Sequence, residues 1–243
     1  MPVVIVLVEP QDPRNVGAVA RAMKNTGLDR LIIVDPPAFD PHRARWMAPS
    51  CEDVFEQMSI VATLDDALVG VQQTIAATAR HRRHDQVVRD PRALGDAIAS
   101  DDRTVALLFG REDHGLSADQ VHRCESIVRI PTPEHASLNV AQAVLLVGHA
   151  LFEARVAQGA PATGRRVGGR AKRATSSLTR DEAPADVTSL EPVVDQVIAL
   201  LAAVDYPSPA EKIRVTARGA LQRAGMTERE VGALRGMLRA LTR

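Results

Sequence analysis

Short apolar segments alternate with stretches of helical periodicity along the first two thirds of the chain. The apolar segments are Val3–Val8, Leu31–Val34, Ile60–Ala62, Thr74–Ala77, Val105–Phe109 and Ile127–Ile130. Such runs are typical of strands that are buried on both faces of a sheet. Strands that alternate with helices are joined by crossovers, which favours parallel pairing. We therefore predict an α/β fold, with a mainly parallel sheet flanked by helices.

The first helix is predicted to follow the first strand closely. Asn15 can cap its N-terminus, because a short polar side chain accepts a hydrogen bond from a free backbone N–H of the first turn. Gly27 is placed to end the helix, since glycine readily adopts the left-handed conformation found after many helices. One face of the helix is apolar and consists of Val16, Val19, Ala20 and Met23.

The apolar periodicity stops after residue 157 and returns near residue 188. Residues 158–187 are rich in Gly, Ala, Arg, Thr and Ser, which predicts a flexible basic linker. Residues 188–243 then show three amphipathic helical patterns. Three short helices enclose a small core, so this helical extension is expected to dock on the main domain, residues 1–157, or on a second chain.

Composition and cysteine usage exclude several classes of protein. With 243 residues, 45% of them hydrophobic, and 30 basic against 30 acidic residues, the chain has the composition of a soluble globular protein. Val3–Val8 is too short to span a membrane and lacks the basic flank and cleavage site of a signal peptide. Cys51 and Cys124 have no partner at disulfide or zinc spacing. We therefore expect a cytoplasmic protein that contacts no membrane.

The balanced charge hides local clusters of basic residues. Arg43 and Arg45 lie in one expected loop, and residues 80–84 are all arginine or histidine in another. Between Arg155 and Arg173 there are six basic residues and no acidic one. A solvated charged surface explains any single cluster equally well, but basic loops also supply the phosphate contacts that nucleic acids require. The charge is therefore compatible with a nucleic-acid partner.

Three segments carry the polar residues on which a functional assignment can rest. They are Glu9–Met23 (EPQDPRNVGAVARAM), Leu108–Ser117 (LFGREDHGLS) and Ile130–Asn139 (IPTPEHASLN). Each lies at the end of a predicted strand, and the third continues into an apolar helix that Ser137 or Asn139 can cap. Loops at the ends of neighbouring parallel strands are a common place for ligand sites.

In their order and spacing, these segments resemble the three motifs of the SPOUT-class RNA ribose 2′-O-methyltransferases. The resemblance covers nearly the whole chain, including Leu190–Val194 and Glu228–Leu238 in the helical extension. It is closest to the TrmJ-type tRNA methyltransferases, which act on nucleotide 32 of the anticodon loop. It implies S-adenosylmethionine as methyl donor, tRNA as substrate and an obligate homodimer. It also implies a trefoil knot in the C-terminal part of the catalytic domain, although knots are exceptional among protein folds.

The resemblance further implies roles for individual residues. Arg21 matches the arginine that is placed at the reacting 2′-hydroxyl, with Asn15 and Ser137 as catalytic neighbours. Glu112 matches an acidic position of the family, although a glutamate there can equally pair with a nearby arginine. The residues expected to contact the methyl donor are Thr78, Ala79, Arg80, Gly110, Ile130, Ser137, Leu138 and Asn139.

The expected chemistry gives Arg21 a role other than that of a base. A guanidinium stays protonated far above neutral pH and is therefore a poor proton acceptor. We assign to Arg21 the orientation of the RNA phosphate and the stabilisation of the developing ribose alkoxide, with the RNA phosphate as an alternative proton acceptor. Because the sulfonium of the donor already activates its methyl group, the transfer itself is expected to need no metal.

Three other interpretations stay open. The same motifs are compatible with a 2′-O-methyltransferase of another tRNA position or of ribosomal RNA. A knotted protein that binds RNA or donor without catalysis is the second, and the intact Asn15 and Arg21 argue against it. The third is a regulator, because Met226–Arg235 is similar to the first helix of some helix-turn-helix domains, although the chain is too short after it for a recognition helix.

Overall fold

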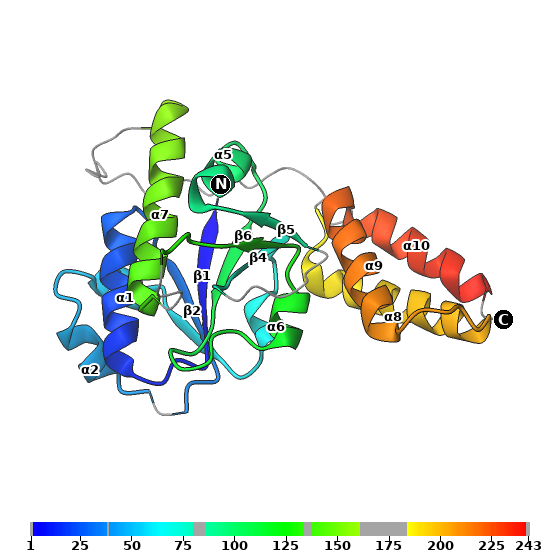
Figure 1. Cartoon of the computed structure of the whole chain (residues 1–243), viewed down its shortest axis with the longest axis horizontal. Coiled ribbons are helices and arrows are strands. Elements are labelled where there is room, and N and C mark those ends of the chain that lie inside the picture. Colours follow the sequence, from blue (N-terminus) through cyan, green and yellow to red (C-terminus); the bar gives the residue numbers. More distant parts are fainter. Residues whose placement is uncertain (1, 38, 80–85, 134–137, 161–183, 242–243) are drawn as a thin grey trace.

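The computed structural model describes residues 2–37, 39–79, 86–133, 138–160 and 184–241. They form a sheet flanked by helices, from one side of which three C-terminal helices extend (Figure 1). The strands are β1 (Val3–Val8), β2 (Arg30–Val34), β3 (Ser59–Val61), β4 (Gln73–Ala77), β5 (Val87–Arg89), β6 (Val105–Phe109) and β7 (Ser126–Val128). The helices are α1 (Pro13–Asn25), α2 (Pro41–Trp46), α3 (Glu52–Glu56), α4 (Leu64–Ala67), α5 (Pro91–Ile98), α6 (Ala118–His122), α7 (Val140–Ala157), α8 (Val187–Ala203), α9 (Ala210–Ala224) and α10 (Glu228–Leu241).

The sheet has the order β3-β2-β1-β6-β4-β7-β5, and each of these neighbouring pairs is parallel. The predicted fold class, a mainly parallel sheet flanked by helices, is confirmed. Sequence analysis missed β5, which lies at one edge of the sheet. Its apolar run consists of Val87 and Val88 alone, which is shorter than the runs that marked the other strands, and both side chains are exposed. The knot stays a prediction, because residues 134–137, within the third motif, lie outside the described residues.

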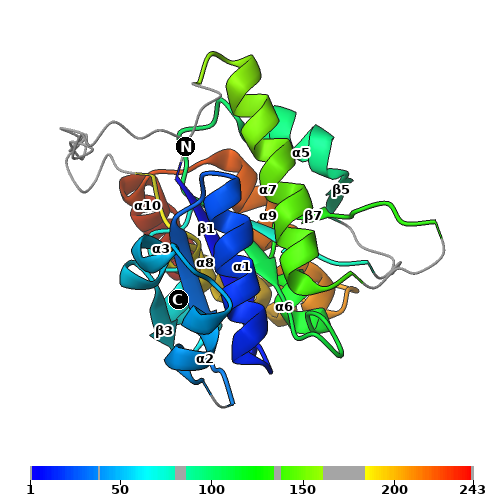
Figure 2. The same cartoon turned by 90° about the vertical axis from the view of Figure 1, so that its left-hand side faces the viewer.

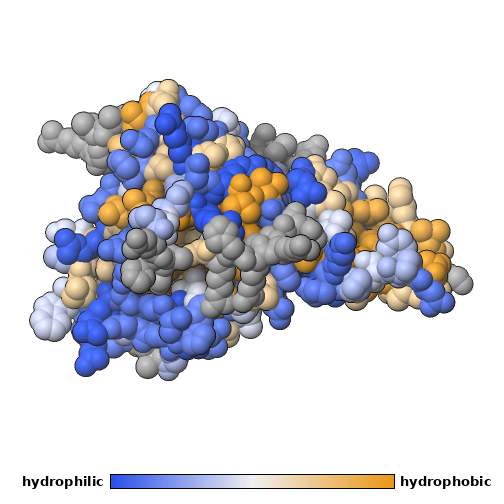
Figure 3. Space-filling model, viewed as in Figure 1, coloured by the Kyte–Doolittle hydropathy of each residue, from blue (hydrophilic) through white to orange (hydrophobic). Residues whose placement is uncertain are grey.

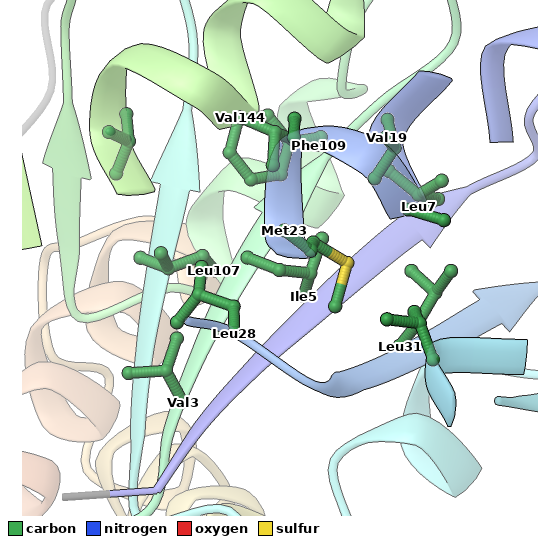
Figure 4. Packing of buried hydrophobic residues seen from close by; sticks show 14 of the residues in the cluster. Val3, Ile5, Leu7, Val19, Met23, Leu28, Leu31, Leu107, Phe109 and Val144 are labelled. Carbon is green, nitrogen blue, oxygen red and sulfur yellow. The ribbon is translucent and has the colours of Figure 1, made fainter. Parts of the chain in front are cut away.

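The two faces of the sheet bury separate clusters of apolar side chains. On β1, Val3, Ile5 and Leu7 point to one face and Val4, Val6 and Val8 to the other, as the alternation of strand side chains requires. The first face is covered by α1, α2, α3, α5 and α7, and Figure 4 shows Met23 and Val19 of α1 packed over it. The second face is covered by α4, α6 and the start of α8.

The first helix begins earlier than the sequence predicted. Asp12 caps α1 by accepting a hydrogen bond from the Arg14 N–H at 2.8 Å, and Pro13 occupies the first helical position. An aspartate followed by proline suits this start, because proline has no N–H to leave unpaired and its φ is already helical. The prediction that Asn15 caps the helix is therefore wrong. Asn15 lies inside the first turn, where its side chain is available for contacts outside the helix.

Helix α2 replaces a predicted loop. Arg43 and Arg45 were expected in an irregular stretch, but Asp40 caps a short helix that contains both. This helix packs closely on α1 at Gly17, where a Cβ would lie 2.1 Å from the Ala44 carbonyl oxygen. Glycine at that position therefore lets α2 lie against the first half of α1. The basic residues 80–84 and most of 155–173 lie outside the described residues.

The C-terminal helices dock on the second face of the sheet. Their own core is small and includes Leu190, Val193 and Val231. The Val187 N–H donates to the Val71 carbonyl at 2.8 Å, and Gln222 donates to the Thr74 hydroxyl at 3.4 Å. The segment that resembled a helix-turn-helix opening forms α10 and contributes Val231 to this core. We call the contact zone of α8 and α9 with α4, α6 and β4 the seam.

Helix α7 lies beside α1 on the first face of the sheet, with α5 on its other side (Figure 2). By length and composition it is the one described helix able to cross a membrane, which is weak evidence because core helices pass the same test. Here Val144, Val147 and Leu151 are buried against the sheet cluster, so α7 acts as a core helix. Its outward residues Leu145 and Leu146 remain 40% and 45% exposed.

Candidate functional site

A cavity of about 330 Å³ opens at the carboxyl edge of the sheet, where β4, β6 and β7 end. Ligands bind at this edge in many parallel α/β proteins, because the loops after neighbouring strands converge there. Most of the wall is apolar, and the polar part comes from the strand-end residue Thr78 and the loop after β6. The lining residues are Ala77, Thr78, Ala79, Phe109, Gly110, Arg111, Glu112, Asp113, His114, Gly115, Val128, Ile130, Leu138, Val140 and Ala143.

The loop after β6 folds back on itself to form one wall of the cavity. The Gly115 N–H donates to the Arg111 carbonyl at 2.8 Å, and Gly115 has a φ of +65°. A Cβ on Gly110 would lie 2.2 Å from the Gly115 carbonyl carbon and from the Leu116 nitrogen. Any side chain at Gly110 must therefore displace this loop, so glycine is required by the chain's own close approach.

Side chains from all three motifs meet in one hydrogen-bonded network. The Asn15 amide donates to Glu112 Oε1 at 2.8 Å, and the Asn139 amide donates to Asn15 Oδ1 at 3.1 Å. The Gln11 backbone N–H donates to Glu112 Oε2 at 2.9 Å. Asn139 also caps α7, since its Oδ1 accepts from the Ala141 N–H at 2.9 Å. We call Asn15, Glu112 and Asn139, with the Gln11 N–H, the motif network.

The arginine in the second motif is held by acids on either side. Arg111 forms two hydrogen bonds with Asp113, at 3.0 and 2.9 Å, and lies 3.5 Å from Glu9. Hydrogen bonds from Arg111 and then from His114 hold the pKa of Asp113 well below its usual range. Both acids thus contact Arg111, and Glu112 is the carboxylate that engages the motif network.

Most of the predicted donor-contact residues come together at this cavity. Thr78, Ala79, Gly110, Ile130 and Leu138 line it. Asn139 is beside Leu138 and belongs to the motif network. Arg80 and Ser137 lie outside the described residues.

The structure does not bring Arg21 to the cavity of its own chain. Arg21 is six positions after Asn15, which leaves their side chains about 120° apart around a helix of 3.6 residues per turn. Asn15 is half-buried and joins the motif network, whereas Arg21 is exposed. The prediction that Asn15 and Arg21 face the same cleft is therefore not fulfilled within one chain.

Sequence reasoning missed the link that Glu112 makes. The alternatives given for Glu112 were a family role or pairing with an arginine, but its described partners are the Asn15 amide and the Gln11 backbone. No spacing rule reveals this contact, because the two segments are 97 residues apart in the chain. Phe109, Val140 and Ala143 of the cavity wall were also missed, and their places at a strand end and a helix start were the available signal.

Among the described residues, one cluster has the composition of a metal site. Ligand atoms of Asp119, His122 and Glu211 all lie within 4.8 Å of one another at the seam. The nearest pair, His122 Nδ1 and Glu211 Oε1, is already a hydrogen bond of 3.2 Å. The cluster belongs to the docking of α9 on α6, and none of its members lines the cavity.

Comparison with known proteins supports a single family. The SpoU rRNA Methylase family matches residues 2–149. The tRNA (cytidine/uridine-2′-O-)-methyltransferase TrmJ of Klebsiella pneumoniae is 34% identical over 243 residues, covering 98% of this chain and 95% of the relative. The tRNA (cytidine/uridine/adenosine-2′-O-)-methyltransferase TrmJ of Pseudomonas aeruginosa is 32% identical and covers 96% and 91%, respectively.

The crystal structure of TrmJ from Z. mobilis ZM4 has a TM-score of 0.77 to this fold, with 29% identity and complete coverage of both chains. The similarity therefore extends through the C-terminal helices as well as the sheet. Taken with the family match over most of the sheet domain, it shows that the chain belongs to the SpoU rRNA methylase family and is a SPOUT-class methyltransferase of the TrmJ type.

Proposed function

We propose that the protein transfers the methyl group of S-adenosylmethionine to the ribose 2′-hydroxyl of nucleotide 32 in tRNA. The observation that carries this proposal is the cavity at the sheet edge, joined to the motif network by Asn139 and Glu112. The TrmJ relatives, which are named as tRNA 2′-O-methyltransferases, support the substrate class. The helical extension, which resembles that of the TrmJ-type enzymes, supports the target position.

The cavity suits the methyl donor in size and character. Its volume of about 330 Å³ lies at the lower end of the range of small-molecule sites, roughly 300 to 1,000 Å³. Apolar walls from Phe109, Ile130 and Leu138 fit a flat adenine ring. Thr78 and the backbone of the loop at Gly110 offer polar groups for the ribose and the amino-acid end. We assign Thr78, Ala79, Arg80, Gly110, Ile130, Ser137, Leu138 and Asn139 to donor binding.

Two copies of the chain are proposed to form the working enzyme. The exposed Leu145 and Leu146 give α7 an uncovered apolar strip beside α1, the helix that carries Arg21. Pairing of two copies through this surface accounts for an exposed Arg21 that lies outside its own cavity. In the dimer, Arg21 of one copy serves the cavity of the other and stabilises the alkoxide, while Asn15 and Ser137 position the ribose.

Methyl transfer by this site needs no metal ion. The donor sulfonium supplies a good leaving group, and the arginine, aspartate and histidine side chains of the cavity wall are bound to one another, while Glu112 is bound to Asn15 and Gln11. We therefore expect EDTA to leave transfer to a prefolded RNA stem-loop unchanged. A cytoplasmic location and the absence of membrane contact follow from the proposed tRNA substrate.

The proposal is tested by transfer of labelled methyl from S-adenosylmethionine to unmodified total tRNA and to ribosomal RNA. Nuclease mapping then locates the modified ribose. We expect label at nucleotide 32, and loss of about 100-fold or more in rate for Arg21→Ala. Label at another tRNA position or in ribosomal RNA overturns the target while keeping the chemistry. The family description, which names ribosomal RNA methylases, makes ribosomal RNA the second candidate.

Mixing of two inactive variants tests whether the site is shared. Arg21→Ala removes the proposed catalytic arginine, and Gly110→Val blocks the cavity. If each site combines Arg21 of one chain with the cavity of the other, random reassortment places an intact site in every mixed dimer. About a quarter of wild-type activity should then return, since half of the dimers are mixed and one of their two sites is intact. If each site is built from one chain, mixing the two variants restores no methyl-transfer activity.

A further inference from the structure

The sole tryptophan of the chain lies almost fully in solvent. Trp46 is 85% exposed at the end of α2, in a chain whose aromatic content is 2%. Large aromatic side chains are normally buried for much of their area, because they are the most strongly stabilised by removal from water. An exposed tryptophan in a chain so poor in aromatic residues is expected to be covered by a bound molecule.

Helix α2 presents Trp46 together with arginines. Ala44 is fully buried against α1, and Trp46 is two residues further on, so its side chain points to the opposite side of the helix. Arg43 precedes Trp46 by three residues and therefore shares its exposed side. Arg45 lies with its guanidinium 5.6 Å from the ring of Phe55, which holds it at the same end of the helix.

This surface adjoins the proposed catalytic end of α1. The close approach at Gly17 fixes α2 against the first half of α1, two residues after Asn15. Asp12, whose pKa is lowered by hydrogen bonds from Arg14, also feels the charge of Arg43. Burial raises the pKa of Cys51, which follows α2. The nearby positive charge of Arg21 opposes that rise. Trp46 thus lies at the end of a short helix that packs on α1 at Gly17, four positions before Arg21.

We propose that Trp46 stacks on an unpaired base of the RNA loop that carries the reacting ribose, and so helps to fix which nucleotide reaches the site. The proposal rests on the 2′-O-methyltransferase function given above. Single-stranded bases that are splayed from a loop are commonly held by an aromatic ring with arginines on the adjacent phosphates. Trp46 supplies the ring, and Arg43, on the same side of α2, supplies the charge.

The surroundings of α2 favour RNA over a second copy of the chain as the occupant. In Figure 3 the surface at lower left, where α2 lies in Figure 1, is mainly hydrophilic. A contact between copies is expected to bury a continuous apolar surface, which is the character of Leu145 and Leu146 on α7. Trp46 has arginine on the same side of its helix, and arginine carries the charge that a phosphate backbone attracts.

Because Trp46 is the sole tryptophan, its fluorescence reports directly on the proposed contact. The wild-type protein is titrated with an unmodified anticodon stem-loop RNA, and separately with a hairpin of the same stem closed by a compact tetraloop. We expect the first RNA to quench the emission and the second to leave it nearly unchanged. An anticodon stem-loop that is methylated but does not change the emission overturns the proposal and leaves the proposed function intact.

Variants give a second measurement that does not depend on fluorescence. Trp46→Ala should weaken binding of the stem-loop about tenfold, and Trp46→Phe, which keeps a ring, about threefold. The matched control is Tyr206→Ala, which removes the sole tyrosine, 53% exposed and beyond α8. It should bind the stem-loop as the wild type does. Equal binding by Trp46→Ala and the wild type contradicts the proposal.

The same experiments separate the remaining outcomes. If dilution without RNA changes the emission, and Trp46→Ala lowers the fraction of dimer, Trp46 belongs to an interface between copies and the stacking proposal fails. If the stem-loop quenches Trp46 in both wild type and Arg21→Ala but neither protein transfers a methyl group, base stacking stands and the proposed function fails. Quenching in both with transfer by the wild type alone supports both.

Discussion

The cavity and the seam are both concave and both join distant parts of the chain, but they are built from different chemistry. The cavity has mostly apolar walls, and Glu112 on its wall joins it to the motif network, in which Asn15 and Asn139 are neutral amides. The seam is lined by charged side chains, most of which pair with a neighbour on their own side, as Arg218 does with Glu191 and Arg123 with Asp65. They include Asp65, Asp119, Arg123, Glu191, Asp195, Glu211, Arg214 and Arg218.

This difference separates a cavity that can bind a ligand from a contact zone that holds the C-terminal helices on the sheet domain. At the seam, Arg218 is 5% exposed and makes two hydrogen bonds to Glu191, at 2.7 and 2.8 Å, and one to the His122 carbonyl, at 3.1 Å. These charges are already satisfied and offer little to a ligand. The cavity instead keeps space beside apolar walls, where a ligand can bury its surface.

Loss of the buried arginine at the seam should have the largest effect. Arg218→Met leaves the Glu191 carboxylate without its main partner, which should cost about 3 to 5 kcal/mol of unfolding free energy in urea. Arg214→Met, which breaks a more exposed pair with Asp195, should cost less than about 1 kcal/mol. Donor binding should survive both changes under native conditions. Equal losses for the two variants contradict the distinction between a buried and an exposed pair.

The next largest effect is expected from a side chain at Gly110. Gly110→Val should weaken binding of S-adenosylmethionine by about 100-fold, because the added atoms displace the loop that forms a cavity wall. Calorimetry measures the binding, and urea unfolding checks that the fold remains. The matched control is Gly236→Ala on α10, where a Cβ meets no atom within 4 Å. That variant should bind the donor normally; unchanged binding by Gly110→Val would rule out this cavity as the donor site.

A smaller effect is expected from breaking the motif network. Asn15→Ala removes the amide that donates to Glu112 and should lower the rate of methyl transfer about tenfold. Asn15→Asp should be slower still, because it places two carboxylates within hydrogen-bonding distance. Combination with Glu112→Gln should restore part of that second loss. An Asn15→Asp enzyme faster than Asn15→Ala argues against an ionised Glu112 in the network.

The smallest effect is expected for the pH dependence of stability, through the buried carboxyl group of Glu125 at the start of β7. Burial raises the pKa of Glu125, and among the described residues its Oε2 has no hydrogen-bond partner. An acid with a raised folded pKa is costly to ionise in the native state, so the stability of the native state falls as pH rises through that pKa. Glu125→Gln should therefore raise the melting temperature at about pH 8 and change it less at about pH 3.5, below the pKa of an unfolded glutamate. A larger gain at the acidic pH contradicts this direction.

Regular patterns were enough to predict most of the sheet, and the family resemblance supplied many of the cavity residues. Most of the buried strands were found because both of their faces are apolar. The predicted strand at residues 60–62 forms β3, but Ile60 is 49% exposed, so the expected burial on both faces is wrong there, and β5 was missed because its apolar run is only two residues long. Gly110 and Ile130 were assigned to the donor site through the family resemblance, and both line the cavity at the ends of parallel strands. The start of α1 was misplaced because Asn15 has the properties of a cap and Asp12, with Pro13 after it, is a better one.

Contacts between distant segments could not be predicted from such patterns. The pairing of Asn15 with Glu112 and with Asn139 depends on how three loops meet after the sheet has formed. The docking of Arg218 on the His122 carbonyl likewise depends on where the helical extension comes to lie. Helical periodicity fixes which residues share a face of one helix, but it carries no information on the partner of that face.

The motif network has a consequence for the order in which the protein becomes able to work. Its hydrogen bonds join residues 97 and 124 positions apart, and the strand that precedes the second motif must insert between β1 and β4 before those residues meet. Such long-range closure is slow compared with the formation of local helices. A newly made chain can therefore hold its first helix long before it can hold a methyl donor, and donor binding becomes a sign that synthesis has passed Asn139 and that folding of the sheet is complete.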